Sequence, residues 1–97
     1  MMELLILVCS DTLQIEVDQM LEELKIAGYT HVPQAVGSGI GGGIRLNDEV
    51  WPGSNSLYMI SANPQQTAEI KSRVRKYRTE PLREGMKLFT LPLIEVI

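Results

Sequence analysis

Residues 3–28, ELLILVCSDTLQIEVDQMLEELKIAG, change part-way from one hydrophobic pattern to another. The first seven residues form an almost continuous apolar run, which is typical of a strand buried on both faces. Apolar residues then recur every three or four positions, a pattern that predicts an amphipathic helix over 12–27. Asp11 is a suitable N-cap for this helix, and Gly28 is a suitable stop after its last turn. The segment therefore predicts a buried strand followed directly by a helix.

Three more strands are predicted further along the chain. Residues 30–37 contain Pro33, and because proline cannot donate a hydrogen bond to a neighbouring strand, we expect this strand at a sheet edge. Residues 56–62 form a third apolar strand. Residues 87–96 form the last strand, and Pro92 within it again favours an edge position.

A second helix is predicted between the third and the last strand. Asn63 supplies its N-cap, Pro64 occupies its first position, and the helix runs to about Thr79. The order β-α-β-β-α-β is that of the α+β ferredoxin-like fold, an antiparallel four-stranded sheet with two helices on one face. In its usual strand order the first and third strands are central, so the two proline-containing strands lie outside. The 97 residues predict a single domain over 1–97.

Both faces of this sheet are apolar, although two helices cover only one of them. Apolar residues occupy consecutive positions in the first strand: Leu4, Leu5, Ile6, Leu7, Val8 and Cys9. An open apolar face of this size is unfavourable on a monomer. We therefore expect it to be buried against other subunits in a closed symmetric ring, and a monomer with an exposed apolar face is the alternative.

Charge and composition exclude several classes of protein. Nine basic and twelve acidic residues give a net charge of −3, which argues against a general nucleic-acid binder. The single cysteine allows no internal disulfide and fits a reducing compartment. No apolar run approaches the roughly 20 residues needed to cross a membrane, so no membrane insertion is expected. The first apolar run also lacks the basic start of a signal peptide, so we expect a cytoplasmic protein.

The connection over residues 37–55 is long and begins with a glycine-rich stretch. It contains a G-x-G-x-x-G pattern, but no predicted helix follows to bind a pyrophosphate, so the pattern does not indicate a dinucleotide site. Glycines let backbone N–H groups approach an anion closely, and the alternative is a flexible connector. We expect residues 38–50 to be the most mobile segment and to become ordered on a ligand or partner. The candidate ligand-binding glycines are Gly37, Gly39, Gly41 and Gly42.

Trp51, the only tryptophan, lies in the same connection. Tryptophan is enriched at binding hot spots, and the alternative is that Trp51 pins the connection to its own subunit. Seven basic residues fall between residues 63 and 87. They form either the solvated face of the second helix or an anion-binding rim around Arg83 and Lys87.

No catalytic set is visible in the sequence. His31 is the only histidine and has no second ligand at metal-site spacing, while Cys9 lies in an apolar run where an inert buried thiol is expected. An acylphosphatase-like enzyme would use Arg45 with Asn47 or Asn55, but it requires the arginine in the loop after the first strand. We therefore expect no enzymatic activity. A dimeric ferredoxin-like ligand-binding module is a further alternative.

Several short pieces of the sequence, taken in order over the whole chain, resemble the PII family of signalling proteins. The pieces are the β-α-β-β-α-β order, Gly28-Tyr29-Thr30, Trp51-Pro52-Gly53-Ser54-Asn55, and Lys87-Leu88-Phe89-Thr90-Leu91-Pro92-Leu93. The segment around Pro52 resembles the short-loop PII-like proteins more than the nitrogen regulators themselves.

The resemblance implies a homotrimer whose inner sheet faces pack together, with an adenine nucleotide or another small ligand bound in the clefts between subunits. Lys87 carries over directly from the family's phosphate loop and Gly85 more loosely, with Arg83 beside them. The long connection would be the effector element that contacts target proteins, often membrane transporters. Its candidate contact residues are Arg45, Trp51, Pro52, Gly53 and Asn55.

Overall fold

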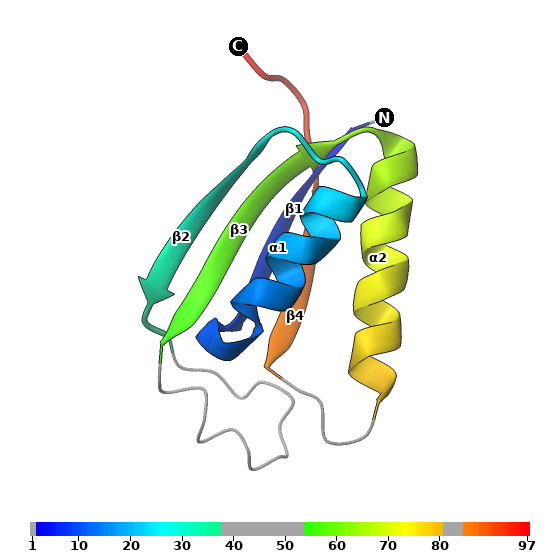
Figure 1. The fold of residues 1–97 in the computed structure, drawn as a ribbon. Helices are drawn as coiled ribbons and strands as arrows, with labels where there is room; N and C mark the ends of the chain where they lie inside the picture. Colours follow the sequence, from blue (N-terminus) through cyan, green and yellow to red (C-terminus); the bar gives the residue numbers. More distant parts are fainter. Residues whose placement is uncertain (1, 38–53, 81–84) are drawn as a thin grey trace.

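The computed structural model describes residues 2–37, 54–80 and 85–97. The elements along the chain are β1 (Glu3–Ser10), the 3-10 helix η1 (Asp11–Leu13), α1 (Gln14–Glu23), β2 (Tyr29–Ala35), β3 (Asn55–Ala62), α2 (Pro64–Thr79) and β4 (Met86–Pro92). This order confirms the predicted β-α-β-β-α-β arrangement. Both helices lie on the same face of the sheet (Figure 1).

The sheet has the strand order β2-β3-β1-β4, and every neighbouring pair is antiparallel. The two proline-containing strands are the outer ones, as predicted. In β2, Pro33 and Gln34 lie in an irregularity where the register with β3 shifts between Val32 and Ala35. Gln34 has a left-handed φ of 58°. The strand ends at Ala35 rather than at residue 37.

The face under the helices forms the hydrophobic core. Its largest fully buried side chains come from β1, β3 and both helices: Leu5, Leu7, Cys9, Val17, Leu21, Tyr58, Ile60 and Ile70. Alternation along the strands places these residues on one face of the sheet and their neighbours on the other. The core therefore uses only half of the apolar residues in the central strands.

The opposite face is open and apolar, as the sequence predicts. It is formed by Leu4, Ile6, Val8, Val32, Leu57, Met59, Phe89 and Leu91. Ile6 lies at its centre, paired with Met59 on one side and Phe89 on the other. Met59 and Phe89 each remain 42% exposed in the single chain.

The first helix differs from its prediction at the C-terminal end. It ends at Glu23 rather than at residue 27. Lys25, and not Gly28, adopts the left-handed conformation that closes the helix, with a φ of 57°. The Ile26 amide donates to the Leu21 carbonyl at 2.9 Å, which forms a Schellman motif. Ile26 and Leu21 are both buried, and this hydrophobic contact ends the helix early.

The cap at the start of this helix also differs from its prediction. Ser10, and not Asp11, is the side-chain cap, and it caps the 3-10 helix η1 that leads into α1: its hydroxyl oxygen accepts a hydrogen bond from the Thr12 amide at 3.3 Å. The Asp11 carboxylate instead accepts a hydrogen bond from Ser56 on β3. The side chain predicted to act locally therefore makes a long-range contact.

The second helix begins as predicted. Asn63 and Gln66 form a reciprocal capping box, and Pro64 is the first helical residue. The Gln66 amide group also donates to the carbonyls of Leu24 and Lys25, at 3.1 and 3.2 Å. One side chain thus fixes the start of α2 to the end of α1.

The last strand is shorter than predicted. It ends at Pro92, whose partner is Glu3, the first residue of β1. Beyond this pair only one further hydrogen bond is formed in the described structure, from the Leu93 amide to the Met2 carbonyl at 3.2 Å. Residues 93–97 therefore extend past the end of β1 (Figure 1).

Candidate ligand and effector site at one end of the sheet

Four of the predicted site residues fall within the described structure, and all lie at the same end of the sheet. Gly37 follows β2, Asn55 begins β3, and Gly85 and Lys87 flank the start of β4 (Figure 1). The other candidates lie outside the described residues: Gly39, Gly41, Gly42, Arg45, Trp51, Pro52, Gly53 and Arg83. The mobility predicted for residues 38–50 also concerns residues outside this description.

Gly85 joins the start of β4 to the end of β1. Its φ is 85°, a conformation that favours glycine, and its carbonyl accepts a hydrogen bond from the Ser10 amide at 2.9 Å. Lys87 pairs with Val8 and is half-buried. Because Met86 points into the core, alternation places Lys87 on the open face. A basic side chain therefore lies at the loop end of the apolar open face.

Asp11 is the centre of a polar group that we call the stem cluster, formed by Asp11, Gln34, Ser54 and Ser56. The Ser56 hydroxyl donates to Asp11 Oδ1 at 2.7 Å, and the Asp11 amide donates to the Ser54 carbonyl at 3.1 Å. Hydrogen bonds from the Ser54 and Ser56 side chains, the charge of His31 and the Gln34 backbone N–H lower the pKa of Asp11. The cluster thus favours an ionised carboxylate.

The stem cluster holds both strands that flank the 38–53 segment. Gln34 lies near the end of β2, and Ser54 immediately precedes β3. The pairing of Ala35 with Asn55 brings these two strand ends side by side. Asn55 itself is buried within this pairing. Sequence reasoning did not find the cluster, because it interpreted Asp11 as a local helix cap.

A second polar contact joins α1 to β3 further from the loop end. The Tyr58 hydroxyl donates to Asp18 Oδ1 at 2.8 Å, and the Tyr58 ring stacks on His31 with centroids 4.2 Å apart. Burial, followed by the hydrogen bond to Asp18, raises the pKa of Tyr58. His31 is thus part of an aromatic stack. Within residues 2–37, 54–80 and 85–97, no group of three potential metal ligands occurs.

Cys9 matches the expectation of an inert buried thiol. Its side chain is fully buried, and burial raises its pKa to about 12, with smaller contributions from the charges of Asp11 and Asp18. At neutral pH the thiol therefore stays protonated, and the thiolate needed for nucleophilic chemistry is not formed.

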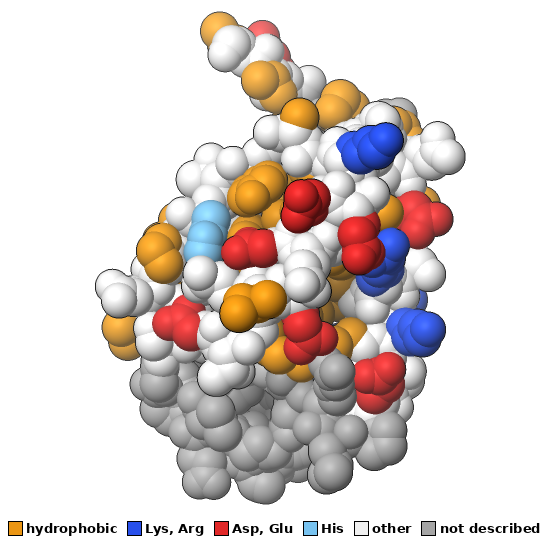
Figure 2. All heavy atoms as spheres, viewed as in Figure 1, with side chains coloured by type: hydrophobic (Ala, Val, Ile, Leu, Met, Phe, Trp, Pro, Cys, Tyr) orange, Lys and Arg blue, Asp and Glu red, His pale blue; other side chains and the backbone are white. Residues whose placement is uncertain are grey.

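Several bases of α2 have partners within the chain. Lys71 forms an ion pair with Glu3 at 2.8 Å, and Arg73 forms one with Glu23 at 2.7 Å. Arg78 donates to the Met86 carbonyl at 2.8 Å, beside the start of β4. These three bases hold α2 against its neighbours. The basic face of α2 lies next to acidic side chains around α1 (Figure 2).

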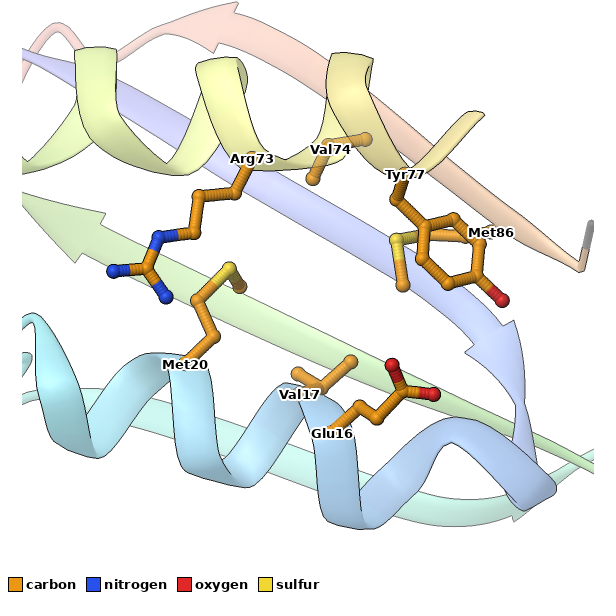
Figure 3. A pocket seen from close by; sticks show the side chains of 7 residues that line it. All are labelled: Glu16, Val17, Met20, Arg73, Val74, Tyr77 and Met86. Atoms are coloured by element: carbon orange, nitrogen blue, oxygen red, sulfur yellow. The ribbon is translucent and has the colours of Figure 1, made fainter. Parts of the chain in front are cut away.

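A small groove lies between the two helices (Figure 3). It encloses about 170 Å³ and is lined by Glu16, Val17, Met20, Arg73, Val74, Tyr77 and Met86. Its floor is apolar, and charged side chains stand at its edges. Ligand pockets for drug-sized molecules enclose about 300–1,000 Å³, so this groove is too small for a nucleotide. We therefore place the candidate site at the loop end of the sheet.

Among the described residues, neither helix has the length and apolar character required to cross a membrane. No protein-family model matches the sequence, and no curated protein matches it. The fold, however, is that of several solved structures.

Three of these structures are PII-like proteins. One is a PII-like signalling protein from Thermus thermophilus. It is 23% identical to this chain with a TM-score of 0.65, and the match covers 92% of this chain and 83% of that one. The protein CPII from Thiomonas intermedia, bound to ADP, AMP and acetate, is 10% identical with a TM-score of 0.72, over 93% and 83% of the two chains.

CPII, a nitrogen regulatory PII-like protein, was also solved with ADP, AMP and bicarbonate. That structure is 11% identical to this chain, with a TM-score of 0.69 and coverage of 93% and 89%. These comparisons establish that the chain has the fold of PII-like signalling proteins, in agreement with the resemblance seen in the sequence.

Proposed function

We propose that this protein is a single-domain PII-like regulator. It forms a homotrimer, binds a small ligand between subunits, and changes the activity of a partner protein through the 37–55 connection. It carries out no chemistry of its own. The observation that carries this proposal is the open apolar face of the sheet, which lies opposite both helices.

The open face supports an assembly because its side chains are large, apolar and contiguous. The pairings of Ile6 with Met59 and Phe89 place three such side chains across the middle of the sheet. A face of this kind is normally buried in a soluble protein. Three copies arranged around an axis would bury the faces against one another and leave the helices outside.

The end of the sheet supports the proposed ligand site. Lys87 lies on the open face beside Val8, so trimer formation would bring its positive charge to a cleft between subunits. Gly85, two residues earlier, has a left-handed φ of 85°. An adenine nucleotide offers the phosphate that such a basic cleft would bind, and CPII was solved with ADP and AMP.

The partner is proposed to be a cytoplasm-facing target such as a membrane transporter, contacted by Arg45, Trp51, Pro52, Gly53 and Asn55. Trp51 would provide the main apolar contact. Replacing Trp51 with alanine is then expected to weaken partner binding by more than about 1 kcal/mol while the trimer remains intact. Loss of the trimer in this variant would instead make Trp51 a structural residue.

The acylphosphatase-like alternative receives no support from the loop after β1. That loop would have to provide a cation for the acyl phosphate. It contains Asp11 instead, whose pKa is lowered by hydrogen bonds from Ser54 and Ser56, so the position carries a negative charge. A negative charge there would repel the phosphate.

The proposal is tested by measuring mass and ligand binding together. Light scattering is expected to give the mass of three subunits, whereas a mass of two would favour the dimeric module. In a thermal-shift series, ADP or AMP should raise the unfolding midpoint, with about 2.7 kcal/mol of stabilisation at a hundredfold excess over the dissociation constant. Bicarbonate and cyclic nucleotides complete the series.

A matched pair of variants locates the ligand. Lys87→Gln should reduce the shift produced by the nucleotide, while Lys76→Gln, which removes an exposed base from α2, should leave it unchanged. An equal loss in both variants, or no shift with any nucleotide in the wild type, would contradict a nucleotide site at the start of β4.

A further inference from the structure

We propose that Asp11 is a positioning residue that fixes where the 37–55 connection leaves the sheet, by holding the strained backbone of Gln34 on one side and Ser54 and Ser56 on the other. This inference rests on the proposed role of the connection as the effector element. It concerns only how the described strand ends are held.

The position of Asp11 in the fold makes this role possible. Asp11 directly follows β1, a central strand that pairs on both sides. Its backbone is fixed, because its own amide donates to Ser54 and the preceding Ser10 amide donates to Gly85. The carboxylate is therefore held at a fixed point beside the end of the edge strand β2 and the start of β3.

The contact on the β3 side is short and long-range. The Ser56 hydroxyl lies 2.7 Å from Asp11 Oδ1, at the start of η1, and 3.0 Å from Gln14 Oε1, at the start of α1. Hydrogen bonds to a charged acceptor are roughly twice as strong as neutral ones. Ser56 is fully buried, so its hydroxyl depends on these two acceptors, and Asp11 is the closer of them.

The contact on the β2 side holds a strained residue. Gln34 has a φ of 58°, which residues other than glycine seldom adopt, and it lies where the β2–β3 register shifts. Its backbone N–H is one of the hydrogen-bonding groups that lower the pKa of the Asp11 carboxylate. Strained conformations persist only where the surroundings over-determine them. The carboxylate supplies that constraint from outside the β2–β3 ladder.

The arrangement also gives a physical link between the two halves of the proposed site. Ser10 holds Gly85, at the start of the ligand-side strand, and the adjacent Asp11 holds the two strand ends of the connection. Two consecutive residues therefore connect Gly85 to the strand ends that flank the connection.

The experiment measures amide hydrogen exchange by NMR in the full-length protein. In Asp11→Asn, which keeps the side-chain shape and removes the charge, the amides of Gln34 and Ser56 should exchange about tenfold faster than in wild type. The amides of Leu5 and Leu7 in β1 should exchange at unchanged rates. The matched control is Asp18→Asn. Asp18 is an acidic residue of α1 that accepts a hydrogen bond from Tyr58, which is not part of the stem cluster.

Two further measurements separate positioning from general stability. In the wild type, the Gln34 amide chemical shift should change with pH at the titration of Asp11, below the ordinary carboxyl range, and this change should be absent in Asp11→Asn. Gln34→Gly removes the backbone strain at this position. When Asp11→Asn is added to Gln34→Gly, exchange of the residue-34 amide should therefore accelerate less than when Asp11→Asn is made in the wild type.

The inference is overturned if Asp11→Asn exchanges at wild-type rates, or if Asp18→Asn accelerates the same amides equally. If Asp11→Asn does not fold, the Ser56→Ala variant and the wild-type pH titration test the proposal instead. A Gln34 amide chemical shift that does not change with the titration of Asp11 would contradict it. Light scattering and nucleotide binding are measured separately. A monomer that binds no ligand would refute the proposed function while leaving the exchange result to stand on its own.

Discussion

Tyr58 donates its hydroxyl hydrogen to Asp18 at 2.8 Å, which places a buried phenol on a carboxylate of the overlying helix. The Tyr58 side chain is fully buried, and its ring also stacks on His31. The hydroxyl is thus satisfied only by reaching out of the core to α1. This contact fixes the helix along β3 at a point two residues from Ser56, where Asp11 makes the equivalent contact.

Tyr58→Phe should therefore lower the free energy of unfolding. The variant keeps the ring and its stacking but removes a hydrogen bond to a charged acceptor, which contributes about 1.5–3 kcal/mol. Urea titration followed by circular dichroism measures the change. Tyr29→Phe is the control, because Tyr29 is exposed and its ring lies 6.1 Å from that of Tyr58. An equal cost in both variants would show that the Asp18 contact contributes little.

A second prediction concerns the left-handed residue at the end of α1. Lys25→Gly should raise the free energy of unfolding, because the left-handed backbone costs about 1–2 kcal/mol for residues other than glycine, partly offset by the greater entropy of glycine in the unfolded chain. We expect a net gain of about 0.5 kcal/mol. The Schellman hydrogen bonds are made by the backbone and remain.

The control for this prediction is Gly28→Ala. Gly28 has no left-handed φ, and an added Cβ would meet no atom within 4 Å. Alanine there should be neutral or stabilising, since it restricts only the unfolded chain. If Lys25→Gly lowers stability while Gly28→Ala raises it, the strain assigned to Lys25 is wrong. Both variants are compared by urea titration.

The start of α2 and the positions of the outer strands could be predicted from the sequence. Asn63 caps α2 because its partner, Gln66, is three residues away, and such local patterns can be read directly. Pro33 and Pro92 likewise predicted the outer strands correctly. A proline lacks the backbone N–H that a central strand needs, and this can be read from a single residue without knowing its neighbours in space.

Contacts between distant segments could not be predicted in this way. Asp11 fits a local cap, yet its carboxylate bonds Ser56, which is 45 positions away along the chain. Lys25 ends α1 because Ile26 becomes buried against Leu21, a consequence of packing that overrides the preference for glycine. The stem cluster was missed because its members come together only when β1, β2 and β3 pair.

The pH dependence of stability gives a third prediction, through Cys9. Its pKa is raised from 9.0 to about 12 in the folded protein, first by burial. Between these values the unfolded chain loses the thiol proton and the folded chain keeps it, so the unfolded state binds fewer protons. Stability should therefore fall as the pH rises above about 9, with a slope of about one proton.

Cys9→Ala should lack this component of the slope, although the smaller side chain lowers stability at all pH values. The measurement is the free energy of unfolding of both proteins at several values from about pH 7.5 to 10, in the presence of a reductant. Because Tyr58 also titrates at high pH, only the difference between the two curves is used. If the free energies of unfolding of wild type and Cys9→Ala change with pH in parallel, the Cys9 thiol has the same pKa in the folded and the unfolded protein.

The final prediction tests the open face directly. Ile6 lies at its centre, flanked by Met59 and Phe89, and its side chain points away from both helices. In a monomer, lysine at this position would reach water across the sheet surface, so the fold should survive. In the proposed trimer the same charge would be buried without a partner, which is strongly unfavourable. Ile6→Lys should therefore reduce the mass from three subunits to one while the circular dichroism spectrum is retained. Ile15→Lys, at a position on α1 that is 72% exposed, should keep the wild-type mass. A trimer that persists in Ile6→Lys would mean that another surface joins the subunits.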